Sequence, residues 1–345
     1  MKQRVTMKDI ASKLGLSINS ISLVLNDRAG VSEETRSLVL KTAEEMGYLE
    51  QTKKYSKTYS GKNLCILIQR VYFRDMHFYS KVLLGIEQEA KKNNYDVLMN
   101  VLDQDEIPGS IKNRKVAGII IVGKISDDYL VRVKQYDIPV VLVDTTSLKY
   151  ATDSVMTDNH LGAHQAVRYL IDKGFQKIGY FGDMDYTVSV RERFWGYQEA
   201  LIHLPDIKAY TETSQYIKQY SVVSDIEQYV LNNDTAKIME RVKSVKEMPE
   251  VFFCSNDSVA IQVCNSLKAM GYRIPEDISV MGFDDLDLCT MVVPKLTTVQ
   301  VNKELMGRRA IQLLMWRFAN KATPAEKIMI GVNVIERDSV GQKKE

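Results

Sequence analysis

Polar residues that could bind a small molecule follow short apolar segments at several places along the chain. Five such segments end in Gln69–Arg70, Asp144, Asp183, Asn256–Asp257 and Asp284–Asp285. Carboxylates accept hydrogen bonds and amides both donate and accept them, so the set suits a ligand rich in hydroxyl groups. At any single position the alternative is a strand that ends in an ordinary polar turn. Because ligands of open parallel sheets bind beyond the carboxyl ends of the strands, the five together predict a polar cleft.

The elements that must carry these residues are strands alternating with helices. Apolar runs such as 63–68 and 118–123 alternate with amphipathic stretches such as 78–93 and 160–173. Short, continuously apolar strands separated by helices are typical of parallel sheets covered on both faces. We therefore predict an α/β body, over residues 63–340, made of two doubly wound parallel-sheet lobes.

Signatures of catalysis and of metal binding are missing from the sequence. It contains no GxGxxG, GxxxxGK[ST] or GxSxG motif, so we do not expect an enzyme. His160 and His164 could chelate a metal, but no third ligand follows at a suitable spacing, and packed or solvated histidines are the simpler interpretation. The stretch 284–287 has no EF-hand spacing for a divalent cation. We expect neither a metal nor a cofactor.

The overall composition is typical of a soluble globular protein. Of 345 residues, 45% are apolar and 26% are charged, and no apolar run reaches the roughly 18 residues of a membrane span. The first residues lack the apolar segment of a signal peptide. The four cysteines are widely spaced and form no CxxC pair. We expect a cytoplasmic protein with buried, reduced thiols and no membrane contact.

Residues 1–47 predict a separate domain of three short helices. Thr6 with Asp9 resembles a capping box, Ser17 can cap a second helix that runs to about Leu25, and Ser32 can cap a third. The inner stripe expected for the third helix is Thr35, Leu38, Val39, Ala43 and Met46. Two helices joined by a tight turn and braced by a third form a helix-turn-helix arrangement.

The charge is concentrated at this end of the chain. Residues 1–62 hold 11 Lys and Arg against 7 Asp and Glu, a charge of +4 in a chain whose total is +2. The segment 48–62 is polar, contains several lysines and has no core pattern, which indicates a linker. A basic head on a slightly acidic body favours contact of the head alone with a polyanion.

The head sequence "VTMKDIASKLGLSINSISLVLNDRAGVSEETRSLVLKTAEEMGY" resembles that of the lactose/galactose-repressor (LacI/GalR) family of bacterial transcription regulators. The resemblance continues through "VAGIIIVG", "IPVVLVD", "RERFWGY", "FCSNDSVAIQ", "IPEDISVMGFDD" and "PKLTTVQ", and so covers nearly the whole chain. It implies a homodimer that binds double-stranded operator DNA. It also implies a periplasmic-binding-protein-like body whose cleft takes a small effector, often a sugar.

The resemblance implies specific effector-binding residues, which are His77, Phe78, Asp144, Arg191, Trp195, Asn256 and Asp284. The first cleft loop departs from the family pattern, because Met76, His77 and Phe78 stand where Asn-Pro-Phe is usual. Two alternatives remain open here. Trp195 could pack in the core, and Arg191 could form an ion pair with Asp183 or Glu192.

The same resemblance implies lobes that interleave along the chain. We expect an N-lobe of about 63–160 and 293–322, and a C-lobe of about 161–292 and 323–340, joined by three crossing segments. Effector contacts from both lobes would favour closure of the cleft. The rival interpretation is a transport-type sugar-binding protein without DNA function, against which the helical head argues.

The second helix is the element expected to enter the major groove. A helical wheel points Ile21, Val24 and Leu25 inward. The head residues expected at the DNA are Thr6, Ser17, Ile18, Asn19, Ser20, Ser22, Leu23 and Asn26, and those of the linker are Lys53, Lys54, Tyr55 and Lys57. In the family a linker leucine wedges into the minor groove. Lys57 stands at that position here and is a poor wedge, so two alternatives remain open: intercalation of Tyr55 or Tyr59, and a solvated linker without groove insertion.

Leu23 yields a prediction about the operator. Most relatives carry at this position an arginine that reads guanine, whereas leucine can only contact a thymine methyl group. Selection of bound sites from a random DNA pool should therefore return A·T pairs where relatives prefer G·C. A requirement for G·C opposite Leu23 would refute this assignment.

Overall fold

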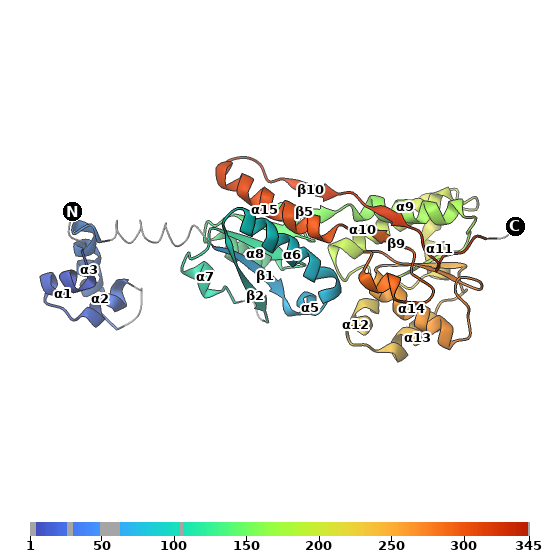
Figure 1. Cartoon of the computed structure of the whole chain (residues 1–345), viewed down its shortest axis with the longest axis horizontal. Helices are drawn as coiled ribbons and strands as arrows, with labels where there is room; N and C mark the ends of the chain where they lie inside the picture. The colour runs from blue at the N-terminus through green and yellow to red at the C-terminus, as the bar shows by residue number, and fades with distance from the viewer. Residues whose placement is uncertain (1–4, 26–29, 49–62, 104–105, 344–345) are drawn as a thin grey trace.

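The computed structural model describes residues 5–25, 30–48, 63–103 and 106–343. A small helical head is followed by a body in which two α/β lobes lie one after the other (Figure 1). Parallel sheets form in both lobes, so the predicted fold class is confirmed. The linker residues Lys53, Lys54, Tyr55 and Lys57, and also Asn26, lie outside the described residues.

The head consists of α1 (Met7–Leu14), α2 (Ile18–Leu25) and α3 (Glu33–Glu45). Its first cap is the expected one, since Thr6 accepts from the Asp9 amide while the Asp9 carboxylate accepts from the Thr6 amide. The head has a core of its own, made of Ile10, Ala11, Ile21, Val24, Val39 and Ala43. One expectation for the inner stripe is wrong, because Leu38 is 51% exposed and Thr42 is buried in its place. On the helical wheel Leu38 lies at the margin of the buried stripe and Thr42 lies nearer its centre, so the apolar type of Leu38 was a poor guide to its burial.

The N-lobe is built on a six-stranded parallel sheet with the order β10-β5-β4-β3-β1-β2. Its strands are β1 (Asn63–Gln69), β2 (Asp96–Leu102), β3 (Gly118–Val122), β4 (Val140–Val143), β5 (Asp153–Thr157) and β10 (Lys327–Ile330). Its helices are α5 (Arg70–Phe73), α6 (Met76–Lys92), α7 (Gly109–Lys112), α8 (Asp127–Lys134) and α15 (Lys303–Ala319).

The C-lobe is built on a three-stranded parallel sheet, β6 (Ile178–Phe181), β7 (Val251–Cys254) and β8 (Ser279–Met281). Its helices are α9 (Asn159–Asp172), α10 (Val188–Ala200), α11 (Thr213–Tyr220), α12 (Ile226–Leu231), α13 (Thr235–Lys243) and α14 (Asp257–Ala269). Short 3₁₀ turns are η1 (Leu201–His203), η2 (Tyr210–Glu212) and η3 (Asp287–Thr290), and the hinge side carries the antiparallel pair β9 (Thr298–Gln300) and β11 (Asn333–Ile335).

The chain crosses between the lobes at points that differ from those expected. Thr297 bridges to Met281, so β9 extends the C-lobe and the return to the N-lobe comes at α15 rather than at 293. The segment 323–330 belongs to the N-lobe, because β10 pairs with β5. The crossing points depend on which strands pair across long distances in the sequence. The periodicity of apolar residues carries no information on that pairing.

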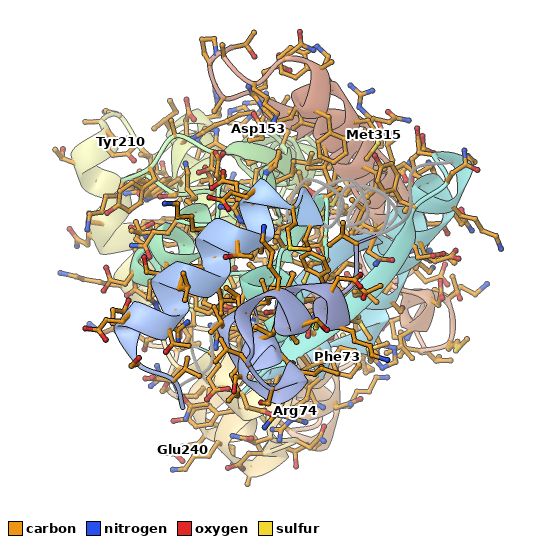
Figure 2. The ribbon with its side chains drawn as sticks, turned by 90° about the vertical axis from the view of Figure 1, so that its left-hand side faces the viewer. Phe73, Arg74, Asp153, Tyr210, Glu240 and Met315 are labelled. Atoms are coloured by element: carbon orange, nitrogen blue, oxygen red, sulfur yellow. The ribbon has the colours of Figure 1, made fainter. Side chains whose placement is uncertain are left out.

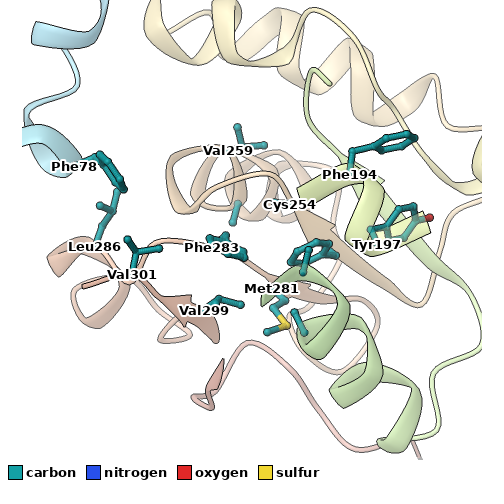
Figure 3. Close-up of a cluster of buried hydrophobic side chains, with 14 of the residues drawn as sticks. Phe78, Phe194, Tyr197, Cys254, Val259, Met281, Phe283, Leu286, Val299 and Val301 are labelled. Atoms are coloured by element: carbon teal, nitrogen blue, oxygen red, sulfur yellow. The ribbon is translucent and has the colours of Figure 1, made fainter. Parts of the chain in front are cut away.

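The two lobes share one apolar core across the hinge. In the part of that core drawn in Figure 3, the ring of Phe78 from α6 lies close to Leu286 and Val301, and Phe283 lies to their right in the view. The four cysteines are free and buried, as the sequence predicts. Among the described residues, no helix is both long and apolar enough to span a membrane.

Helices α6 and α15 cross so closely that glycine is required at the contact. A Cβ atom added to Gly307 would overlap the carbonyl oxygen of Val82, and one added to Gly85 would overlap that of Glu304. Both obstacles are backbone atoms, which cannot rotate away as a side chain could.

Gly307→Ala should therefore destabilise the protein by about 1–3 kcal/mol, the usual cost of overpacking. The measurement is the midpoint of thermal unfolding. Gly331→Ala is the matched control, because a Cβ there meets no atom within 4 Å. Equal midpoints for the two variants would contradict the close crossing.

Candidate ligand cleft and nucleic-acid interface

A buried arginine organises the space between the lobes. From α10, Arg193 donates through Nη2 to Asp284 Oδ1 at 2.8 Å, and the two side chains are only 4% and 8% exposed. Its Nε donates to Asn159 Oδ1 at 2.9 Å, and Nη1 donates to the Ser255 carbonyl oxygen at 2.7 Å. The guanidinium also lies 3.9 Å from the centre of the Phe283 ring. All three of its nitrogens are thus engaged by C-lobe residues.

Asp144, after β4, connects the N-lobe to this centre. One carboxylate oxygen accepts from the Tyr79 hydroxyl at 2.9 Å, and the other accepts from Ser189 Oγ of the C-lobe at 2.6 Å. Burial raises the pKa of Asp144, while the hydrogen bond from Ser189 and the charge of Arg193 act in the opposite direction. The two lobes therefore meet through hydrogen bonds to one carboxylate.

Both central carboxylates sit on strained backbone. Asp144 has a φ of 57° and Asp284 a φ of 118°, a region that residues other than glycine seldom adopt. Such conformations cost on the order of 1–3 kcal/mol each and are found where the surrounding structure holds them. The strain marks the ends of β4 and β8 as places whose geometry serves more than packing.

These groups surround a small cavity, here called the inner pocket, of about 40 Å³. A cavity of that size holds about three water molecules. Among its wall residues are Tyr72, Phe78, Tyr79, Asp144, Ser189, Arg193 and Asp284. With the lobes in this arrangement, the polar groups at the centre are satisfied mainly by one another.

A larger cavity, here called the outer chamber, adjoins the inner pocket and has a volume of about 330 Å³. The two cavities share Asp75, Tyr186 and Asn256 as walls. Arg74 lies at the chamber and, seen from the side of the head, well below Asp153 (Figure 2). The chamber is formed mainly by α12, α14 and the start of α6.

Two acids at the chamber have strongly shifted pKa values. Burial, followed by the nearby charge of Asp284, raises the pKa of Asp75 to about 6. Burial raises the pKa of Glu227 to about 7, although this carboxylate accepts hydrogen bonds from Ser255 Oγ and from the Asp183 amide. Titratable groups with shifted pKa values in a cleft are typical of functional sites.

The residues predicted to bind the effector separate into two groups. Phe78, Asp144, Asn256 and Asp284 line the inner pocket, and His77 lines the outer chamber. Arg191 and Trp195 reach neither cavity.

Arg191 lies two positions from the arginine that the cleft uses. Its side chain turns outward, where it pairs with Asp185 at 3.2 Å and donates to the Met184 carbonyl oxygen. In the segment "RERFWGY", the resemblance therefore pointed to Arg191, whereas the arginine that lies in the cleft is Arg193. Trp195 is 46% exposed on the outer side of α10, so neither ring stacking nor core packing describes it.

The sequence patterns did not predict several residues of the cleft, which are Arg193, Ser189, Tyr79, Asp75 and Glu227. One signal was available, because Ser189 and Arg193 are four apart and so share a face of α10. The others depend on which way α6 and α12 turn toward the cleft. The residue types alone do not contain that information.

Not every polar strand end reaches the cleft. Arg70 pairs with Asp103, and the Asp257 carboxylate accepts from the Leu286 amide and from Thr298. Asp285 pairs with Arg337. These residues hold loops in place. At these positions the alternative interpretation applies, a strand that ends in an ordinary polar turn.

The candidate metal residues have other partners. His160 lies 3.0 Å from Glu199, and the ring of His164 packs edge-on against His203. Asp287 pairs with Lys81 of the N-lobe. Within the described ranges, no group of three or more His, Cys, Asp or Glu residues is placed to hold a metal ion.

In the head, α2 presents part of the expected surface. Ser17 caps the helix by accepting from the Ser20 amide at 3.0 Å, Asn19 is exposed, and Ile18 is 51% exposed. Leu23 is half-buried rather than fully outward, and its Cδ1 would lie 3.2 Å from a Cβ on Gly30. Leu23 therefore combines packing with a partly exposed surface, and Thr6 serves as the cap of α1.

The contrast between the two arginines can be measured. Arg193→Met leaves Asp284 buried without its partner, which should cost about 3–5 kcal/mol. Arg191→Met breaks an exposed pair, whose contribution is about 0–1 kcal/mol. Thermal unfolding of both variants is expected to show a large fall for the first and almost none for the second. Equal falls would refute the central role of Arg193.

Comparison with known proteins agrees with this architecture. The model of bacterial regulatory proteins of the LacI family matches residues 6–51, and the model of the periplasmic binding protein-like domain matches residues 167–340, half of the chain. The HTH-type transcriptional repressor PurR of Mannheimia succiniciproducens is 26% identical, over 97% of this chain and 98% of the relative.

Two solved structures have the same fold. A CelR–cellobiose complex matches with a TM-score of 0.66 and 21% identity, over 97% of this chain and all of that one. A lac repressor dimer bound to operator and an anti-inducer matches with a TM-score of 0.67 and 20% identity, over 98% and 99% of the two chains. The chain belongs to the LacI family and is a DNA-binding transcriptional regulator with a periplasmic-binding-protein-like body, not a transport-type binding protein.

Proposed function

We propose that this regulator is a cytoplasmic homodimer whose affinity for a palindromic operator is set by a small polar effector in the cleft between the lobes. The observation that carries the proposal is the convergence of Asp144, Arg193 and Asp284 at the junction of the lobes. Carboxylates and a guanidinium offer acceptors and donors to the paired hydroxyls of a sugar or sugar derivative.

Closure of the cleft is the step that would carry the signal. Besides the bonds to Asp144, Lys81 of α6 pairs with Asp287, and Lys124 donates to the Tyr186 carbonyl oxygen at 3.2 Å. Each of these contacts joins the N-lobe to the C-lobe. A ligand that binds both lobes stabilises the closed arrangement by its differential affinity for that state.

The head supplies the contact with DNA. In this proposal α2 enters the major groove, with Asn19 pairing with an adenine edge and Ser17, Ser20 and Ser22 near phosphates. Thr6, Ile18, Leu23 and Asn26 complete the surface. Lys53, Lys54, Tyr55 and Lys57 of the linker are proposed to contact the backbone or the minor groove.

Two similar structures support the proposed second subunit and effector class. The lac repressor dimer shares this fold, and the structure with cellobiose shares the two-lobed body. Sedimentation is the direct measure of assembly, and a dimer has twice the chain mass of 39.4 kDa.

Gel-shift titration with the DNA upstream of the protein's own gene tests the function. We expect specific binding, which Asn19→Ala weakens by about 5- to 150-fold, the equivalent of a lost base contact. Asn265→Ala, an exposed position on α14, is the matched control and should leave binding unchanged. Asp284→Ala should abolish the response to an effector. A full response in Asp284→Ala would refute the cleft assignment, and absence of specific DNA binding would refute the regulator.

A further inference from the structure

The two cavities of the cleft differ in what they could hold. Small-molecule sites usually have volumes of about 300–1,000 Å³. The outer chamber, at about 330 Å³, lies in that range, whereas the inner pocket, at about 40 Å³, does not. They adjoin through Asp75 and Asn256. A ligand anchored at Arg193 and Asp284 would therefore have room to continue into the outer chamber.

The chamber has the mixed surface that a sugar ring requires. Its apolar lining residues are Val230, Leu231, Ile261 and Leu288. Its lining also includes the amides of Asn256 and Gln262. A ring with hydroxyls at its edge and C–H groups on its face matches such a combination.

Two amides at the chamber retain hydrogen-bonding capacity. Gln262 lines the chamber, and its Oε1 has no hydrogen-bond partner among the described residues; that atom is buried, so the amide must turn toward the chamber to meet a ligand. Asn256 uses Oδ1 to cap α14, accepting from the Val259 amide at 2.9 Å, so its amide nitrogen remains a donor. Unpaired buried polar groups are costly, and a ligand that pairs with them gains affinity.

The charges determine which ligands are excluded. The carboxylates of Asp75 and Glu227 line the chamber, and those of Asp144 and Asp284 line the inner pocket. Arg193 is already committed to Asp284; Arg74 also lines the chamber, but its side chain is exposed to solvent, where its charge is screened. An acidic or phosphorylated group in the chamber would face carboxylates without a free buried cation, and like charges repel strongly there.

We propose that the outer chamber holds a second unit of the effector, which is a glycoside of at least two units that is neutral or amino-bearing rather than acidic. Resting on the proposed function, this inference names the ligand class of the same cleft. Gln262 and Asn256 read the distal unit, and Asp75 excludes anions. The arrangement makes the chamber a specificity subsite distinct from the Arg193 centre.

Isothermal titration calorimetry on the full chain tests the ligand class without DNA. The probes are glucose, galactose, glucosamine, cellobiose, maltose, lactose, the chitosan disaccharide, glucuronate, glucose 6-phosphate and lactobionate. At least one neutral or amino disaccharide should bind ten or more times more tightly than its monosaccharide. Tightest binding by a monosaccharide or an acidic probe, or no binding by any disaccharide, overturns the proposal.

Variants localise the second unit. Gln262→Leu should reduce the preference for the disaccharide over its monosaccharide at least tenfold, whereas Gln165→Leu, an exposed control on α9, should not change it. In Asp75→Asn, the affinity for lactobionate should rise toward the affinity for lactose. A loss of folding would lower both affinities and could not produce this rise. An unchanged preference in Gln262→Leu, or an unchanged gap in Asp75→Asn, contradicts the subsite.

The subsite and the regulatory function are tested by different measurements. Calorimetry reports the ligand and gel-shift titration reports the operator, so either can fail alone. A protein that binds disaccharides but not its upstream DNA would refute the regulatory proposal and leave the subsite intact.

Discussion

The buried ion pair between Arg193 and Asp284 is the interaction on which the arrangement of the cleft depends. Arg193 bonds three segments at once, namely the start of α9 through Asn159, the end of β7 through Ser255 and the end of β8 through Asp284. Burying a charged pair costs desolvation energy that good geometry must offset. Because the guanidinium makes directional bonds to all three segments, it specifies their relative positions more than it contributes stability.

This centre explains why the cleft can respond to a ligand. Asp144 is held by one hydroxyl from each lobe, and its own backbone is strained. A ligand hydroxyl that replaces either partner exchanges one hydrogen bond for another, so the net free energy is small and its sign depends on lobe position. The hydrogen bonds at this junction can therefore rearrange more easily than the close-packed apolar core that the two lobes share.

The head is packed independently of the body. Its core of six buried residues is separate from that of the body. Small hydroxyl and amide side chains leave α2 with little charge but many hydrogen-bonding groups, as reading of base edges requires. Leu23 belongs partly to this surface and partly to the packing near Gly30, so its operator preference is linked to the stability of the head.

The sequence by itself determined the alternation of strands and helices, the helical head and three polar residues of the cleft, Asp144, Asn256 and Asp284. Those properties follow from local patterns, since an apolar run, a helix cap and a polar strand end each depend on residues that are close together in the sequence. Tertiary structure decided that Arg193 rather than Arg191 enters the cleft, that Asp75 and Glu227 join it, and that β10 returns to the N-lobe. These outcomes depend on which face of a helix meets a distant strand, a relation that packing sets and that residues two positions apart cannot reveal on their own.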